Sequence, residues 1–149
     1  MDATTLNTSP FGTRIHAEDI VDTLGFFDSW EDRYKYIIDL GKELPAIDSA
    51  KQTDTYLIRG CQAQVWLDAS VESDKIWFEV DSDAFIVKGL LGVVLAAYNG
   101  KSAQEILDFD IDAYFAELDL LKHLSQTRGN GLRAMVKRIR DIAGAAATN

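Results

Sequence analysis

The apolar positions of the chain predict helices toward both ends and strands between them. Over 20–27 apolar residues recur at helical spacing. Ser29 followed by Asp32 is a capping pattern that predicts the start of a second helix, and Gly41 predicts its end. Residues 42–53 show no periodicity, so we expect an extended connector there.

The middle of the chain predicts a small antiparallel sheet. Residues 56–58 are a short β-prone run, and longer runs follow over 63–71 and 75–80. The residues at 72–74 are typical of a turn between the two longer runs. We therefore expect three strands, with Cys61 in the connection between the first two.

Residues 84–98 are apolar on almost every side, which predicts a buried central helix. The carboxylates of Asp81-Ser82-Asp83 precede it, where the helix dipole favours negative charge, and Asn99-Gly100 is typical of a helix end. Three further helices are expected: a short one opened by a Ser102–Glu105 capping box, one over 112–121 and a last one over 126–143. The predicted class is α+β, with a small antiparallel three-stranded sheet packed against several helices.

Length and composition favour a single domain over 1–149. With 47% hydrophobic residues the chain can bury a core, whereas the polar residues 1–13 are expected to form a flexible leader. The three tryptophans, Trp30, Trp66 and Trp77, are expected in the core. No export signal or membrane span is visible, so we expect a cytoplasmic protein without a membrane partner. A net charge of −9 disfavours nucleic acid as a partner.

Cys61 is the single cysteine of the chain. The chain therefore forms no internal disulfide, and it lacks the Cys/His spacing of a zinc site and the several thiolates of an iron–sulfur cluster. A lone cysteine is most often a small buried apolar residue. However, Gly60 before it permits a loop conformation, and Arg59 is a candidate to stabilise a thiolate. From the residues alone, a buried and a reactive Cys61 both remain open.

Three ordered stretches of the chain carry a resemblance to a known family. They read IRGCQAQVWL over 58–67, DSDAFIVKGLL over 81–91 with YNG at 98–100, and HLSQTRGNGL over 123–132. Together they resemble the SufE-type sulfur acceptor proteins, the partners of the SufS and CsdA cysteine desulfurases. The resemblance covers about residues 20–143. It departs from the family at Ala63, where many relatives carry serine, and at Gly129-Asn130.

The resemblance implies a function in sulfur transfer. A pyridoxal-phosphate-dependent cysteine desulfurase would hold sulfur as a persulfide, and Cys61 would accept that sulfur by thiol exchange. The chain would stimulate the desulfurase without being a self-sufficient enzyme, and would relay sulfur to a downstream scaffold for iron–sulfur cluster assembly. We expect no cofactor or metal in the chain itself, because the pyridoxal phosphate belongs to the partner.

Other residues are candidates for supporting roles. Gly60 is a candidate hinge for a loop that presents Cys61, with a plain turn glycine as the alternative. Arg128, from the third stretch, is a candidate for steering the thiolate or the partner, with a surface ion pair as the alternative. Asp83 is a further candidate, although capping the central helix already explains it.

The last predicted helix carries Arg133, Lys137 and Arg140 on one face. On an acidic protein they form a candidate docking surface for a partner, with an ordinary solvated face as the alternative. His123 is a candidate proton donor, but a capping or surface histidine is the simpler interpretation.

Two other functions remain open from the residues alone. A cysteine hydrolase would need a base histidine near Cys61, but only His16 and His123 exist, and neither lies in a recognised signature. An iron–sulfur scaffold resembling the NifU-type proteins is disfavoured by the single thiolate.

Overall fold

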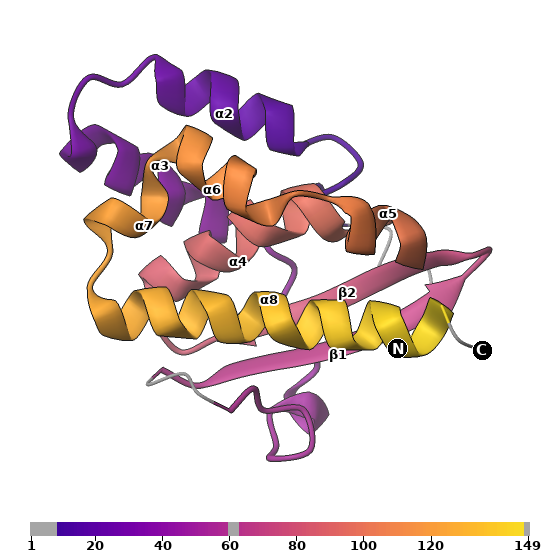
Figure 1. Cartoon of the computed structure of the whole chain (residues 1–149). Coiled ribbons are helices and arrows are strands. Elements are labelled where there is room, and N and C mark those ends of the chain that lie inside the picture. Colours follow the sequence, from indigo (N-terminus) through magenta and orange to yellow (C-terminus); the bar gives the residue numbers. More distant parts are fainter. Residues whose placement is uncertain (1–8, 60–62, 148–149) are drawn as a thin grey trace.

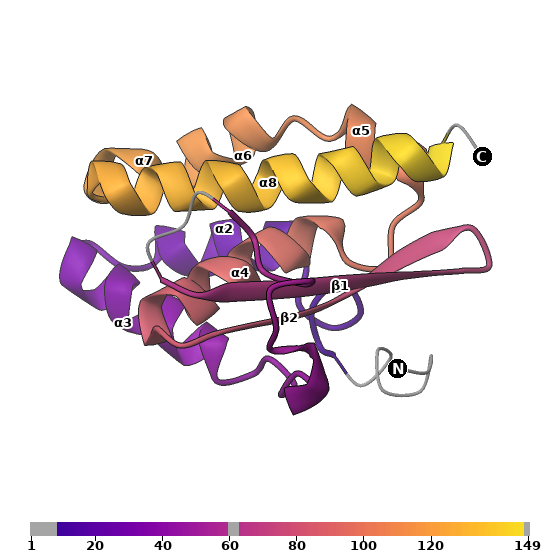
Figure 2. The same ribbon diagram turned by 90° about the horizontal axis from the view of Figure 1, so that it is seen from below.

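The computed structural model describes residues 9–59 and 63–147, and this part of the chain confirms the predicted α+β class (Figure 1). In chain order the elements are α2 (Ala17–Gly25), α3 (Trp30–Gly41), the 3-10 turn η1 (Ser49–Lys51), β1 (Val65–Glu72), β2 (Lys75–Ser82), α4 (Phe85–Tyr98), α5 (Ala103–Asp108), α6 (Ile111–Leu118), α7 (Leu120–His123) and α8 (Gln126–Ala147). Both views show α8 running alongside the β1–β2 hairpin (Figures 1 and 2).

The predicted capping residues begin the helices for which they were proposed. The hydroxyl of Ser29 accepts a 3.2 Å hydrogen bond from the backbone N–H of Asp32 at the start of α3. At α5 the Ser102 hydroxyl accepts from the Glu105 N–H, and the Glu105 carboxylate accepts from the Ser102 N–H, both at 3.1 Å. These bonds satisfy backbone donors that a helix start leaves unpaired, which confirms both caps.

Strands β1 and β2 form an antiparallel hairpin, with Val65 opposite Ser82 at one end and Glu72 opposite Lys75 at the other. The two turn residues, Ser73-Asp74, have φ angles of 53° and 66°. Positive φ at both positions gives a turn whose twist matches that of the strands. The turn lies where the sequence predicted it.

The predicted third strand is present as a short bridge. Residues 56–58 pair antiparallel with β1 through two backbone hydrogen bonds, from Ile58 N to Val65 O at 2.8 Å and from Leu67 N to Tyr56 O at 2.9 Å. A hydrogen-bonded turn immediately before this segment limits the pairing to a few residues. The segment therefore adds a narrow edge to the hairpin.

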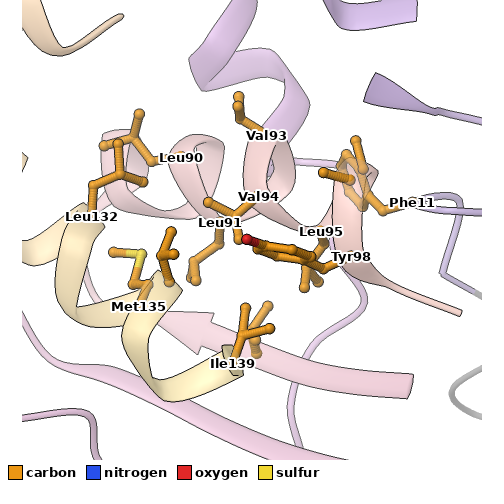
Figure 3. Packing of buried hydrophobic residues seen from close by; sticks show 14 of the residues in the cluster. Phe11, Leu90, Leu91, Val93, Val94, Leu95, Tyr98, Leu132, Met135 and Ile139 are labelled. Atoms are coloured by element: carbon orange, nitrogen blue, oxygen red, sulfur yellow. The ribbon is translucent and has the colours of Figure 1, made fainter. Parts of the chain in front are cut away.

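Helix α4 is the centre of the core, as predicted. Its residues Ile86 to Tyr98 are all buried except Lys88, and the helix contacts α2, α3, α8 and β2. Figure 3 shows Leu132, Met135 and Ile139 of α8 facing the side chains of α4. An apolar helix surrounded on all sides is the arrangement that its sequence requires.

Helices α3 and α4 pack closely where Gly41 and Gly89 meet. A Cβ added at Gly89 would lie 2.1 Å from the carbonyl oxygen of Ile37, and one added at Gly41 would lie 2.7 Å from the Gly89 nitrogen. Helix α3 ends at Gly41 as predicted, but its C-cap residue, Lys42, is right-handed. Gly41 therefore serves the close approach of two backbones and not a left-handed cap.

A half-buried lysine, Lys51, holds the connector before the sheet onto the hairpin. Asp68 and Glu79 lie directly opposite each other on β1 and β2, which is an unfavourable pair of like charges. Lys51 Nζ lies 2.6 Å from Asp68 Oδ2 and 3.1 Å from Glu79 Oε2. Burial alone would lower the pKa of Lys51, but its hydrogen bonds to Asp68 and then Glu79 outweigh burial and raise the pKa to about 12. The connector is thus fixed by an ion-pair network.

The flexible leader predicted for residues 1–13 is wrong from residue 9 onward. Phe11 is fully buried, and its carbonyl oxygen accepts a 3.0 Å hydrogen bond from the Asn99 side chain. A single aromatic residue in a polar stretch forms no hydrophobic periodicity, so nothing in the sequence indicated that Phe11 is buried. Residues 1–8 lie outside the described residues.

The tryptophans do not all enter the core. Trp66 is buried as predicted, whereas Trp30 and Trp77 are half-buried. The Trp77 ring covers Gly100, which has a φ of +72° and leaves no room for a Cβ. The periodicity of the sequence predicted that these tryptophans lie on helices or strands, but it did not predict how much of each ring is exposed to solvent.

The C-terminal helices differ from their predicted bounds. The helix predicted over 112–121 is divided into α6 and α7 at Asp119, whose φ of 56° is left-handed. Helix α8 extends four residues beyond the predicted end, to Ala147. The alanine-rich end continues the helix because alanine has the highest helix propensity.

Candidate functional site

The residues on either side of the predicted sulfur acceptor are joined by a backbone hydrogen bond. The backbone N–H of Ile58 donates to the carbonyl oxygen of Val65 at 2.8 Å, so the chain leaves and returns at paired positions. Gly60, Cys61 and Gln62 lie outside the described residues. The acceptor and hinge roles stay predictions, and the structure describes the frame around them.

The downstream side of this frame is tied to the end of β2. The carbonyl oxygen of Gln64 accepts hydrogen bonds from the Ser82 hydroxyl at 2.7 Å and the Asp83 N–H at 3.3 Å, and its N–H donates to Asp83 Oδ1 at 3.1 Å. The predicted capping role of Asp83 is wrong. The N-cap residue of α4 is Ala84, and no side chain makes a capping hydrogen bond to the start of this helix. The carboxylate is used instead to hold Gln64.

A largely apolar cleft of about 240 Å³ lies among the start of β1, the start of α4 and the first half of α8. Its lining residues are Ala63, Ala84, Val87, Leu90, Thr127, Arg128, Gly131 and Met135. Sites for drug-sized ligands are usually about 300–1,000 Å³. The cleft is therefore better suited to a side chain or two than to a small-molecule substrate.

Arg128 is the charged member of this lining, and the sequence had singled it out. Its side chain is exposed, and Nη1 donates a 3.1 Å hydrogen bond to the Tyr34 hydroxyl of α3. The hydroxyl of Ser125 accepts from the Arg128 backbone N–H at 3.2 Å, which anchors the first turn of α8. A guanidinium held at the rim of an apolar cleft can stabilise an anion that enters it.

The three basic residues predicted to form a docking face have different surroundings. Arg133 is exposed, whereas Lys137 pairs with Asp141 at 2.8 Å. Arg140 is half-buried, and its Nη1 donates to the carbonyl oxygens of Ile106 and Leu107 at 3.4 and 3.3 Å. Arg140 thus binds the end of α5, where a cation is favourable. Docking by these residues stays a prediction.

The histidines have local partners that explain them without catalysis. The His123 ring stacks on Trp30 with ring centroids 4.4 Å apart, and its Nε2 lies 3.5 Å from Asp119 Oδ2. His16 begins α2, and its backbone N–H donates to the Asp19 carboxylate at 2.9 Å. These contacts agree with the simpler interpretation of His123.

The described residues contain no group of three or more His, Cys, Asp and Glu side chains that could hold a metal ion. Among the helices of the same residues, none combines the length and the apolar character that a membrane crossing requires.

Sequence reasoning missed several residues of the site. Tyr34 holds Arg128, and Met135 closes one wall of the cleft, but each lay in a helical period that indicated packing alone. Phe85, at the start of α4, is 75% exposed although it belongs to the most apolar segment of the chain. The pairing of α3 with α8 could not be read from spacing, because it joins residues far apart in sequence.

The fold and the site together define a class: a small α+β protein with a side-chain-sized apolar cleft at the start of β1. The sequence matches the SufE family, described as an Fe-S metabolism associated domain, over residues 18–143. The chain belongs to the SufE family. Membership gives it a general role in sulfur transfer and iron–sulfur metabolism, in association with a cysteine desulfurase.

Similar proteins agree with this assignment. An uncharacterized SufE-like protein of Rhizobium etli is 47% identical over 130 residues, which cover 85% of this chain and 88% of the relative. An uncharacterized SufE-like protein of Rhizobium meliloti is 43% identical over 130 residues, covering 85% and 93%. The solution structure of a hypothetical protein from Thermus thermophilus has a TM-score of 0.73 at 18% identity, and the match covers 89% of this chain and 96% of that one. At that identity it supports the fold alone.

Proposed function

We propose that this chain is a sulfur acceptor that works on a partner's reaction. Cys61 takes persulfide sulfur from a SufS-type or CsdA-type cysteine desulfurase, stimulates its turnover, and passes the sulfur to a scaffold for iron–sulfur clusters. The observation that carries the proposal is the family match over 18–143, which contains the single cysteine of the chain.

The chemical step is a thiol exchange. The Cys61 thiolate attacks the outer sulfur of the partner's persulfide, a new sulfur–sulfur bond forms, and the old one breaks. The partner's cysteine leaves as a thiolate, so the step needs no oxidant or reductant. Cys61 then carries the persulfide, and the desulfurase is free for another cycle.

The frame around the connection supports this role. Two residues of extended chain span at most about 7 Å, and Cys61 is two residues from both Arg59 and Ala63. Ala63 lines the apolar cleft, which has the size of a side chain. A thiol that uses this cleft between transfers would be shielded from oxidants that convert free thiolates to sulfenic acid.

Two supporting roles belong to the proposal. Arg128 at the cleft rim stabilises the thiolate or persulfide, because a guanidinium favours a nearby anion. Gly60 is the hinge that allows Cys61 to reach the partner. Replacing Gly60 with Val should then impair sulfur uptake, whereas unimpaired uptake would remove the hinge.

The proposal also assigns the cofactor and the compartment. Pyridoxal phosphate belongs to the desulfurase, and the acceptor carries sulfur on its thiol with no cofactor or metal of its own. Both proteins work in the cytoplasm, where thiols are kept reduced.

Desulfurase kinetics test the proposal. A panel of SufS-type and CsdA-type enzymes with cysteine is assayed for alanine release with and without this protein. One enzyme should accelerate, and Cys61→Ser should abolish the acceleration while leaving the urea unfolding midpoint unchanged. If no enzyme accelerates, the proposed function fails. Thioester hydrolysis by the protein alone would favour a cysteine hydrolase, and visible absorbance after iron–sulfur reconstitution would favour a scaffold.

A further inference from the structure

A second cleft, of about 190 Å³, lies between the third-strand segment and α8. Its apolar floor and its charged rim come from Leu57, Ile58, Arg59, Ala134, Lys137, Arg138 and Asp141. We call these seven residues the basic cleft. Arg59 and Arg138 are both exposed, whereas Ile58 is buried.

The charges of the basic cleft are not balanced. Lys137 is neutralised by Asp141 at 2.8 Å. Within residues 9–59 and 63–147, neither the Arg59 nor the Arg138 side chain makes a hydrogen bond or an ion pair. Three cations and one carboxylate leave the cleft with a formal charge of +2, on a chain whose net charge is −9. Such a concentration of positive charge on an acidic protein attracts an acidic partner and orients it.

The size and the lining of the cleft select the kind of occupant. A volume of about 190 Å³ lies below the roughly 300–1,000 Å³ of typical small-molecule sites. The apolar floor of Leu57, Ile58 and Ala134 suits the methylene stem of a side chain, and the two arginines suit its carboxylate. Nucleic acid is disfavoured by the net charge of the whole chain. One or two Asp or Glu side chains of a protein fit all of these features.

The position of the cleft indicates which protein is its partner. Arg59 is two residues before Cys61 in the sequence. Helix α8 borders both clefts, because Arg128 and Met135 line the apolar cleft while Ala134 and Arg138 line the basic one. A chain bound across the basic cleft is therefore next to the segment that the proposed function assigns to sulfur transfer.

We propose that the basic cleft docks an acidic segment of the partner desulfurase, with Arg59 and Arg138 binding its carboxylates. This inference rests on the proposed function. It moves the docking surface from the stripe of Arg133, Lys137 and Arg140 to the basic cleft, which shares only Lys137 with that stripe. Sequence spacing did not single out Arg138. The fold brings Arg59, from a distant part of the sequence, to the same cleft.

The test measures binding separately from sulfur transfer. The Cys61→Ser protein, which cannot accept sulfur, is titrated by calorimetry into a panel of SufS-type and CsdA-type desulfurases. Arg138→Glu in that background should raise the dissociation constant about tenfold, because it removes an attraction and adds a repulsion. The dissociation constant should also rise with ionic strength, and less steeply for Arg138→Glu.

Three matched variants make the result specific. Lys42→Glu changes the net charge by the same amount at the exposed residue that follows α3, outside the cleft, and it should change the dissociation constant less than twofold. Arg133→Glu, on α8 but outside the cleft lining, should also have less than a twofold effect. Arg138→Lys keeps the charge and should remain within about threefold of the parent. Urea unfolding checks that each variant is folded.

Several results would overturn the proposal. If Arg138→Glu binds as tightly as Lys42→Glu, or if Arg133→Glu weakens binding as much as Arg138→Glu, the cleft is not the docking site. If inorganic phosphate binds the parent, Arg138→Glu removes that binding and desulfurase affinity is unchanged, the cleft is a simple anion site. If no desulfurase binds, this docking proposal fails, while the proposed function is judged separately by sulfur uptake on Cys61.

Discussion

The contact between α3 and α4, which we call the seam, is packed without space, whereas the surface of α8 that borders the two clefts is open. At the seam, Gly41 and Gly89 bring two backbones so close that a single methyl group has no room. Along α8, clefts of about 240 and 190 Å³ stay open, and arginines stand at their rims. The seam fixes the fold, whereas the α8 surface leaves open space and unbalanced charge, which we propose serve a thiol and a partner. Stability and transfer should therefore respond to different substitutions.

The largest expected effect is on the seam. Gly89→Ala should destabilise the protein by about 3 kcal/mol, because its Cβ would lie 2.1 Å from the Ile37 carbonyl oxygen and the helices must move apart. Urea unfolding measures the change. Gly144→Ala is the control: nothing lies within 4 Å of its added Cβ, so the better helix propensity of alanine should stabilise α8 by up to about 1 kcal/mol. Equal stability of the two variants would contradict the comparison.

Filling the apolar cleft should separate activity from stability. Ala84→Leu places a larger apolar side chain in the lining, so we expect sulfur uptake by Cys61 to fall about tenfold. The unfolding free energy should change by less than about 1 kcal/mol, because the site is already open space. Mass spectrometry after a fixed incubation with the desulfurase measures uptake. Normal uptake in a folded Ala84→Leu protein would show that the cleft has no part in transfer.

The sequence predicted the seam region better than it predicted the α8 surface. The helices of the seam and core followed from local patterns: the apolar run over 84–98 predicted α4, and the Ser29 cap predicted α3. The close approach of Gly41 to Gly89 did not follow from them, because Gly41 was read only as a helix end.

The site depended on contacts that no local pattern records. Asp83 was read as a helix cap because carboxylates suit helix starts, but the end of β2 directs it to Gln64. Arg138 became a docking candidate only because the third-strand segment lies beside α8.

A pH experiment sharpens the account of the scaffold. The pKa of Lys51 is raised from 10.5 to about 12 in the folded protein, so its stabilising contribution is complete below about pH 10.5 and is lost as the pH rises toward 12. The urea midpoint of the wild type should fall over this interval more steeply than that of Lys51→Met. Parallel curves would show that the ion pairs with Asp68 and Glu79 do not stabilise the fold. Sulfur uptake at neutral pH should be similar in both proteins once folding is matched.

The smallest expected effect is at His123. Its ring stacks on Trp30 at 4.4 Å, so His123→Phe preserves an aromatic contact and removes only the ring nitrogens. Sulfur uptake should stay within about twofold of the wild type at every pH between 6 and 8. A tenfold loss that depends on pH would instead make His123 a proton donor.

The central claim is that Cys61 itself carries the sulfur. The direct measurement is peptide mapping by mass spectrometry after a single turnover of the desulfurase with isotopically labelled cysteine, followed by removal of the enzyme. The account predicts one labelled sulfur atom per chain, held on the peptide that contains Cys61 and released by a reductant. A desulfurase that turns over in the presence of this protein while Cys61 remains an unmodified thiol would contradict it.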